Sequence, residues 1–267
     1  MTKVTVDGQK IEVRASTAGA FCLRSRSALL AAGLLAFAQP ALGQASTDGL
    51  DSVSETGTAI KRGPREVDDS AKINRYSKAV ASCVNNRSPD RVQAMLHHSD
   101  PITVDVEAAD IPWKRFEQII EECMGQRLHE FSNDPLLARI GMSFSRNRLR
   151  ALLLEEAYLD DNRSAPVIAE GDPELANRQF VSTGEDLDRA RGLAGFADCL
   201  AYRNGTGADA LLRTEPGSAE ELELAKGLAP TLGACLIAGQ NIEFTPSSIR
   251  ALAADGLWAR AALGPKL

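Results

Sequence analysis

The chain has 267 residues, enough for one large domain or two small ones. It carries 30 lysine and arginine residues against 36 aspartate and glutamate residues, a formal net charge of −6, which disfavours nucleic acid and anionic membranes as partners. Aromatic residues make up only 5%, and the abundance of alanine and leucine favours helices.

The beginning of the chain predicts export. Arg24 and Arg26 precede an apolar run over residues 28–38, and the small residues ALG at 41–43 offer a cleavage site. A basic stub, a short apolar run and a small-x-small site describe a secretory signal peptide, here over residues 1–43. The run is too short for a membrane anchor, which needs about 20 apolar residues. We therefore expect a periplasmic or secreted protein of a Gram-negative bacterium, with no stable membrane span after signal cleavage.

A different pattern precedes the signal. The stretch VTVDGQKIEV at 4–13 predicts a β-hairpin with Asp7 and Gly8 at its tip. Because signal peptides do not usually begin with a hairpin, we hypothesise that translation starts later, near Val13 or Leu23. Residues 44–68 are polar and contain glycine and proline, so we expect a disordered linker there.

Four helices are expected over residues 69–160. Apolar residues of the first recur at steps of three and four: Ile73, Tyr76, Val80 and Cys83. Pro89 and Pro112 are placed to open the second and third helices, and Ser145 is placed to cap the fourth. The stretch ITVDVEA at 102–108 alternates like a strand and is interpreted as an extended loop.

The second half of the chain repeats the first. FSRNRLRAL at 144–152 returns as FTPSSIRAL at 244–252, and ASCVNNRSPDRVQAML at 81–96 aligns with ADCLAYRNGTGADALL at 197–212. The matches occur in the same order, with the cysteines in register. This indicates a duplication, and we call the two halves the first copy and the second copy.

The duplication sets the predicted architecture. We expect an all-α protein of two homologous helical units of about four helices each, the first copy at 69–160 and the second at 183–267. Residues 161–182 would form a connector, in which Asp172-Pro173 could open a short helix. The stretches STGE at 182–185 and SAEE at 218–221 have the form of capping boxes at helix starts of the second copy.

Four cysteines follow the predicted signal: Cys83, Cys123, Cys199 and Cys235. An even count in an exported chain indicates disulfides, and four cysteines allow three pairings. Because each copy holds one early and one late cysteine, we predict one bond per copy, Cys83–Cys123 and Cys199–Cys235. Pairing between the copies is the alternative. A metal site is disfavoured because the spacings are about 40 residues and no C-x-x-C occurs.

The three histidines are His97, His98 and His129. One interpretation is a metal or acid–base cluster of His97 or His98 with Asp100 and His129. Adjacent histidines point about 100° apart on a helix, so the favoured interpretation is a solvated pair at a helix C-terminus. The sequence contains no recognisable nucleophile motif or phosphate loop, so the catalytic residues are unknown and no metal or cofactor is expected.

Two arginine pairs occupy equivalent positions in the copies. Arg87 and Arg203 follow the first cysteine of each copy, and Arg150 and Arg250 lie in the last helix. They are weak candidates for anion ligands in a cleft between the copies. The favoured interpretation has Arg87 and Arg203 capping helix carbonyls and Arg150 and Arg250 in structural ion pairs with the acidic residues five positions later.

One copy has an early cysteine, R-S-P-D-R-x-x-A-x-L, a second cysteine and F-S-x-x-x-L-R-A-L-L-x-E-x-x-Y. This pattern resembles small exported proteins of sphingomonad-type alphaproteobacteria, over residues 70–160 and 185–263. The second copy departs from it where Gly205 and Thr206 replace Pro89 and Asp90. The resemblance implies export and one disulfide per unit, and it implies no activity.

From these features we expect a helical binding or interaction module without catalytic activity. Its surface would be the groove between the copies. The partner would be a periplasmic protein or an envelope component. The alternative is an envelope-associated hydrolase with its site in the same groove. Converging acidic or histidine side chains would favour the hydrolase, and an apolar groove would favour a partner protein.

Overall fold

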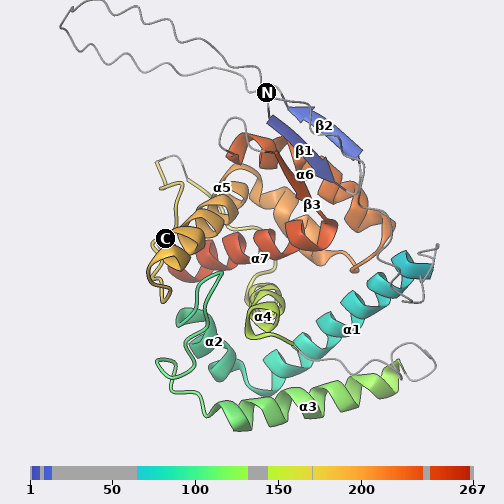
Figure 1. The fold of residues 1–267 in the computed structure, drawn as a ribbon, viewed down its shortest axis with the longest axis vertical. Helices are drawn as coiled ribbons and strands as arrows, with labels where there is room; N and C mark the ends of the chain where they lie inside the picture. The colour runs from blue at the N-terminus through green and yellow to red at the C-terminus, as the bar shows by residue number, and fades with distance from the viewer. Residues whose placement is uncertain are drawn as a thin grey trace, which may run out of the picture. The chain divides into compact units, whose positions relative to one another are not determined.

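The computed structural model describes residues 2–6, 9–13, 65–131, 144–169, 171–236 and 241–264. These residues form seven helices and three short strands (Figure 1). The helices are α1 Arg65–Arg87, α2 Pro89–His97, α3 Trp113–Glu130, α4 Arg146–Asp161, α5 Glu185–Arg213, α6 Ala219–Cys235 and α7 Pro246–Leu263. The strands are β1 Thr2–Val6, β2 Gln9–Val13 and β3 Asn241–Phe244. The predicted all-α class is confirmed, with this small sheet as an addition.

The predicted hairpin is present at the start of the chain. β1 pairs antiparallel with β2, from Thr2 opposite Val13 to Val6 opposite Gln9. The sequence did not predict that β3 would add to it, yet β1 also pairs parallel with β3, in the order β2-β1-β3. The apolar run and cleavage site of the predicted signal peptide lie outside the described residues. The predicted linker is wrong at its end, because α1 already begins at Arg65.

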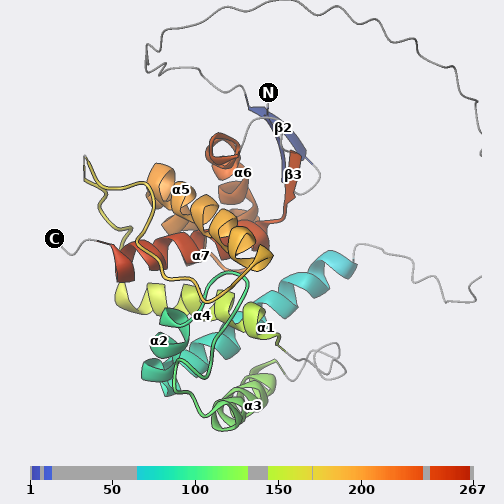
Figure 2. The same ribbon diagram turned by 60° about the vertical axis from the view of Figure 1, so that its left-hand side comes forward.

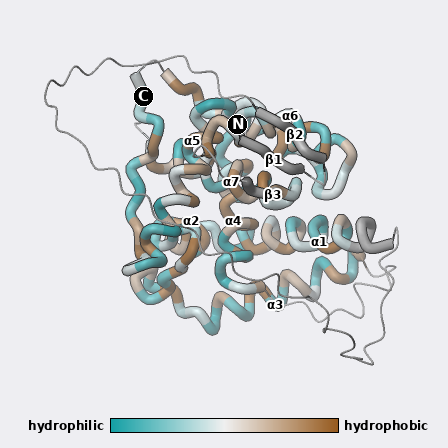
Figure 3. The backbone as a smooth tube through the Cα atoms, turned by 45° about the horizontal axis from the view of Figure 1, so that its top comes forward, coloured by the Kyte–Doolittle hydropathy of each residue, from teal (hydrophilic) through white to brown (hydrophobic). Residues whose placement is uncertain are grey.

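The helices of the first copy begin where the sequence places them. Pro89 is the first residue of α2, Pro112 precedes α3, and the Ser145 hydroxyl accepts the backbone N–H of Arg148 at 3.2 Å at the start of α4. Residues 102–108 form a loop, joined to the end of α2 by an isolated bridge between Ser99 and Val104. Hydrophobic and hydrophilic segments alternate along the helices (Figure 3), which is the pattern of helices buried on one face.

The second copy contains a bend where the alignment expects one. Helix α5 is interrupted at Asn204, whose φ and ψ are −150° and 56°. Ser88, the residue aligned with Asn204, lies between α1 and α2 with φ and ψ of −148° and 54°. The Asn204 side chain accepts the backbone N–H of Gly207 at 3.0 Å, so it caps the second part of α5. The second copy therefore also has four helical segments, as the repeat predicts.

The two capping boxes have different outcomes. Ser218 caps α6 by accepting the N–H of Glu221 at 3.1 Å, while the Glu221 carboxylate accepts the N–H of Gly217 at 2.6 Å. The box at 182–185 is wrong, because α5 begins at Glu185 and Ser182 binds Asp100 instead. The short helix at Asp172-Pro173 is also wrong: the described residues of the connector contain no helix.

Both predicted disulfides are present. Cys83–Cys123 joins α1 to α3, and Cys199–Cys235 joins α5 to α6. Each bond therefore lies within one copy, and together they indicate an oxidising, non-cytoplasmic location. Among the residues that the structure describes, no helix is both long and apolar enough to cross a membrane.

Candidate functional site

The two copies meet where α4 packs on α7, and we call this contact the seam (Figure 2). Figure 2 shows α1, α2 and α3 on one side of the seam and α5 and α6 on the other. The two helices that form it are the repeated segments with which each copy ends. Both helices carry apolar side chains that are almost fully buried: Leu149, Leu153 and Leu154 on α4, and Ile249, Ala253 and Leu257 on α7.

Buried ion pairs cross the seam in both directions. Arg150 Nη2 lies 2.6 Å from Asp255 Oδ1, and Arg250 binds both oxygens of Glu155 at 2.8 Å. The exposed fraction of each of these four side chains is 7% or less. Arg150 and Arg250 are thus in structural ion pairs, as the favoured interpretation has them, but each takes its partner from the other copy.

Each carboxylate of the seam also binds a second cation. Lys78 of α1 contacts Glu155, and Arg178 of the connector lies 2.6 Å from Asp255 Oδ2 and also binds Asp198. Burial alone would raise the pKa of Asp255, but Arg150 and Arg178 outweigh it and hold that pKa below its usual value. Burial has the larger effect at Asp198, whose pKa is raised despite Arg178.

The arginine that binds the carbonyl groups at a helix end is Arg250, and not Arg87 or Arg203 as predicted. Arg250 donates to the carbonyl oxygens of Leu211, Leu212 and Thr214 at 2.7–3.1 Å, at the end of α5. Arg87 instead forms a surface ion pair with Glu122 at 2.8 Å, and Arg203 lies 3.5 Å from Glu174. The predicted capping role of Arg87 and Arg203 is therefore wrong, because neither donates to a backbone carbonyl of the described residues; Arg87 donates instead to the Gln126 side-chain amide oxygen at 2.9 Å.

One end of the seam opens into a cavity of about 230 Å³, which we call the seam pocket. Its polar wall comes from the end of α2 and from the connector, and the ring of Trp258 contributes from α7. The side chains of His97, His98, Asn177 and Gln179 line it and form no hydrogen bond within the described part of the chain. His97 lies edge-on to Trp258, with ring centroids 5.3 Å apart. Arg150 and Arg178 form the inner wall.

The carboxylate at this pocket is fully occupied. Asp100 accepts the backbone N–H groups of Ile102, Thr103, Val181 and Ser182 at 2.7–3.0 Å, and the Ser182 hydroxyl at 2.9 Å. Burial alone would raise the pKa of Asp100, but these donors outweigh it and lower that pKa. Asp100 therefore clamps the connector to the loop that follows α2.

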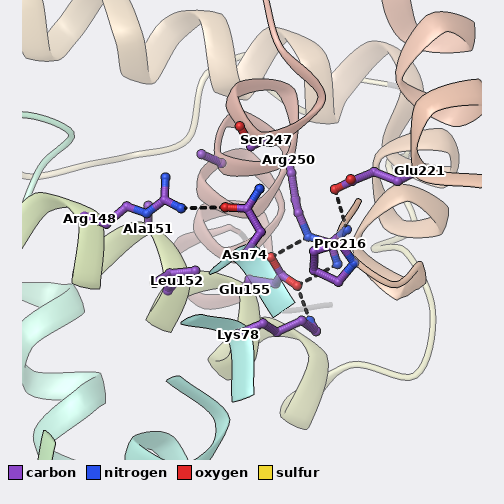
Figure 4. A pocket seen from close by; sticks show the side chains of 11 residues that line it. Asn74, Lys78, Arg148, Ala151, Leu152, Glu155, Pro216, Glu221, Ser247 and Arg250 are labelled. Carbon is purple, nitrogen blue, oxygen red and sulfur yellow. Dashed lines mark hydrogen bonds and ion pairs between the residues drawn. The ribbon is translucent and has the colours of Figure 1, made fainter. Parts of the chain in front are cut away.

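The other cavity at the seam is smaller, and Figure 4 shows the side chains that line it. Its volume is only about 40 Å³. Figure 4 shows Arg250 between Glu155 and Glu221, with Lys78 reaching Glu155 from α1. The two ends thus share the arginine–carboxylate pair and differ in what surrounds it.

The histidine cluster considered from the sequence does not form as a metal site. His97, His98 and Asp100 line one pocket, but His129 lies on α3 and does not line it. No group of three or more potential metal ligands (His, Cys, Asp or Glu) occurs in the described ranges. The sequence analysis missed Asn177, Arg178 and Gln179, because nothing in a polar connector signals which of its residues will face a cavity.

Comparison of the chain with models of protein families, with curated proteins and with solved structures gives no match. The function is therefore inferred from the geometry of the site.

Proposed function

We propose that the chain is an exported binding module that takes a small polar ligand into the seam pocket. The difference between the two ends of the seam carries the proposal. Both ends contain a buried arginine–carboxylate pair, yet the cavity has a volume of about 40 Å³ at one end and about 230 Å³ at the other. The arginine–carboxylate pairs occur at both ends, so we attribute them to packing. The larger cavity and its polar lining occur at one end only, so we assign ligand binding to that end.

The chemistry of the seam pocket favours binding over catalysis. Asp100 is a poor general base near neutral pH, because its pKa is lowered and five donors already bind it. The Ser99 hydroxyl donates to the Leu96 carbonyl and accepts from Arg150 Nε at 2.8 Å, so no histidine activates it.

The remaining lining groups suit a ligand with both donors and acceptors. The carboxamides of Asn177 and Gln179 can donate and accept at the same time, and the imidazole rings of His97 and His98 add further nitrogen atoms for hydrogen bonding. Such groups recognise hydroxyls, amides and carboxylates, and the Trp258 ring supplies an apolar surface beside them. In the periplasm, a periplasmic protein or an envelope component would present or supply such a ligand.

Ligand binding can be tested by thermal melting against amino acids, monosaccharides and short carboxylic acids, with calorimetry on every compound that raises the midpoint. We expect at least one such compound, and we expect the Asn177→Ala/Gln179→Ala variant to lose its effect. Gln118→Ala, on the exposed face of α3, is the matched control and should bind normally. The proposal is wrong if no compound raises the wild-type midpoint or if the pocket variant binds as well as the wild type.

Export to the periplasm or the medium is part of the same proposal and is supported by the two disulfides. Cell fractionation followed by N-terminal sequencing tests it. We expect an exported form that begins at Gln44. Full-length protein confined to the cytoplasm would contradict export.

A further inference from the structure

A further cavity, of about 580 Å³, lies between α1, the end of α3, α4 and the turn from α5 to α6. Four cationic side chains line it: Arg75, Lys78, Arg127 and Arg213. Two carboxylates, from Glu156 and Glu215, also line it. We call this cavity the basic groove. Each of these cations is paired with at least one carboxylate, yet four cationic side chains from three helices gather at one place in a chain whose net charge is −6.

Two arginines of the basic groove are held by ion pairs with exposed partners. Arg75 lies 3.2 Å from Glu215, and the exposed fractions of the two side chains are 36% and 63%. Arg127 pairs with Glu130 three positions along α3. Arg213 is held more firmly, because it binds both oxygens of the buried Asp209 and donates to the Asn162 carbonyl at 2.9 Å. Ion pairs with exposed partners contribute little to stability, so an incoming anion can compete for the guanidinium groups of Arg75 and Arg127.

Two donors of the groove are unsatisfied. The Nε atoms of Arg75 and Arg127 are buried and have no hydrogen-bond acceptor among the described residues. A buried donor without an acceptor is unfavourable, so a small movement of these side chains that brings Nε to a ligand oxygen would relieve it. The side chain of Glu156 is only 12% exposed, and burial raises its pKa even though Lys78 acts in the opposite direction. Lys78 Nζ lies 2.9 Å from Glu156 Oε1, so this carboxylate is already paired with a cation.

We propose that the basic groove binds a small oxyanion of two or more negative charges, such as a phosphate or polycarboxylate group. The planar guanidinium fork matches the paired oxygens of these groups, and converging arginines bind them in preference to a single-charged anion. Phe131 and Pro216 give the groove an apolar part, against which the remainder of the ligand can pack. This site is separate from the seam pocket, so the two proposals can fail independently.

Calorimetric titration with inorganic phosphate and with citrate, at constant ionic strength, tests the basic groove. We expect saturable binding of at least one of them by the wild type. Arg75→Gln and Arg127→Gln should each weaken it by about tenfold, because each removes one charged hydrogen-bond donor. Both positions are partly exposed, so the variants should fold, and their melting curves check this.

Arg87→Gln is the matched control, because Arg87 is a partly exposed arginine of α1 that does not line the groove. It should bind phosphate or citrate as the wild type does, and so should Asn177→Ala/Gln179→Ala. The proposal is overturned if neither anion binds, or if Arg87→Gln weakens binding as much as Arg75→Gln does. It is also overturned if the protein binds phosphatidylglycerol vesicles and neither soluble anion competes, since the groove would then recognise a lipid surface.

Discussion

Burial separates the four repeated arginines into two kinds. The side chains of Arg150 and Arg250 are 5% and 7% exposed, whereas those of Arg87 and Arg203 are 42% and 48% exposed. Ion pairs at the surface contribute little, because water screens them and long side chains must be ordered to form them. A buried guanidinium is different: its removal leaves carboxylates and carbonyls without a partner in a medium that cannot solvate them.

We therefore expect Arg250→Met to lower the free energy of unfolding by about 3–5 kcal/mol, because Glu155 and Glu221 lose a buried partner. Arg87→Met, the matched control at the surface, should change it by less than about 1 kcal/mol. Urea denaturation at pH 7 measures both. Similar losses in the two variants would contradict the distinction by burial.

Asp100 gives a prediction for pH. Its pKa is lowered in the folded chain, so its stabilising effect is complete above the pKa of the unfolded chain, about 3.9, and is lost as the pH falls through the folded-state value. We expect the free energy of unfolding to decrease on acidification below about pH 4, and Asp100→Asn to reduce that slope.

The pKa of Asp255 is also lowered, so its protonation adds to the loss of stability on acidification. The pKa values of Glu156 and Asp198 are raised, so these two groups reduce that loss. The slope should therefore be reduced in Asp100→Asn and not abolished. Urea denaturation between pH 7 and pH 3 measures it. An identical slope in the wild type and in Asp100→Asn would rule out this role for the clamp.

At the scale of the helices, the closest contact lies between α5 and α7. A Cβ atom added at Gly256 of α7 would collide with the carbonyl oxygen of Ala197 and lie 3.0 Å from the Cβ of Ala201. The two helices approach this closely because small residues face each other. Gly192, on the exposed side of α5, has no atom within 4 Å of the equivalent position.

Gly256→Ala should therefore destabilise the protein by about 1–3 kcal/mol, since the backbone of α5 must move. Gly192→Ala should stabilise it by about 0.5–1 kcal/mol, since alanine is the better helix former and has room. Thermal and urea denaturation of the two variants give the comparison. Destabilisation of both by the same amount would show that helix propensity, and not contact, decides the outcome.

At the scale of the whole molecule, covalent bonds close each copy and noncovalent contacts join the two. The disulfides span 40 and 36 residues, so the chain-entropy model gives each a contribution of about 4 kcal/mol. The helices of both copies belong to one compact unit, because the seam is buried. Cooperative unfolding of the two copies together is therefore expected.

Calorimetry of Cys83→Ser/Cys123→Ser and of Cys199→Ser/Cys235→Ser tests this expectation. Each variant should lose about 4 kcal/mol and still unfold in one transition, at a lower temperature than the wild type. Two separated transitions, with only one of them shifted in each variant, would mean that the copies unfold independently.

The sequence predicted the features that depend on near neighbours in the chain, and the internal repeat added the pairing of distant cysteines. The stripe that includes Tyr76 and Val80, the helix starts at Pro89 and Ser145, and the cysteine pairing follow from spacing and from the repeat, and all are found. Distant contacts were not predictable in this way. The sequence shows that Arg150 and Glu155 are charged and five residues apart. It does not show that the partners of both residues lie on α7.

The connector was the least predictable segment for the same reason. The position of Ser182 in the sequence suits a helix cap. In the structure its hydroxyl instead donates to the carboxylate of Asp100 in a distant loop, which is a stronger acceptor because it is charged. Arg178 lies in a stretch without periodicity, and only the fold brings it to Asp255. The polar residues that line the seam pocket were missed because they are defined by that arrangement.

The crossed ion pairs have a consequence for the origin of the molecule. Each seam helix presents an arginine and, five positions on, an acid, so its surface is complementary to a second copy of itself. Contacts of this kind hold symmetric dimers together. If the chain arose by the duplication that its sequence indicates, its two halves meet through the same kind of contact, and the connector, which reaches Asp255 through Arg178, makes one end of the seam unlike the other.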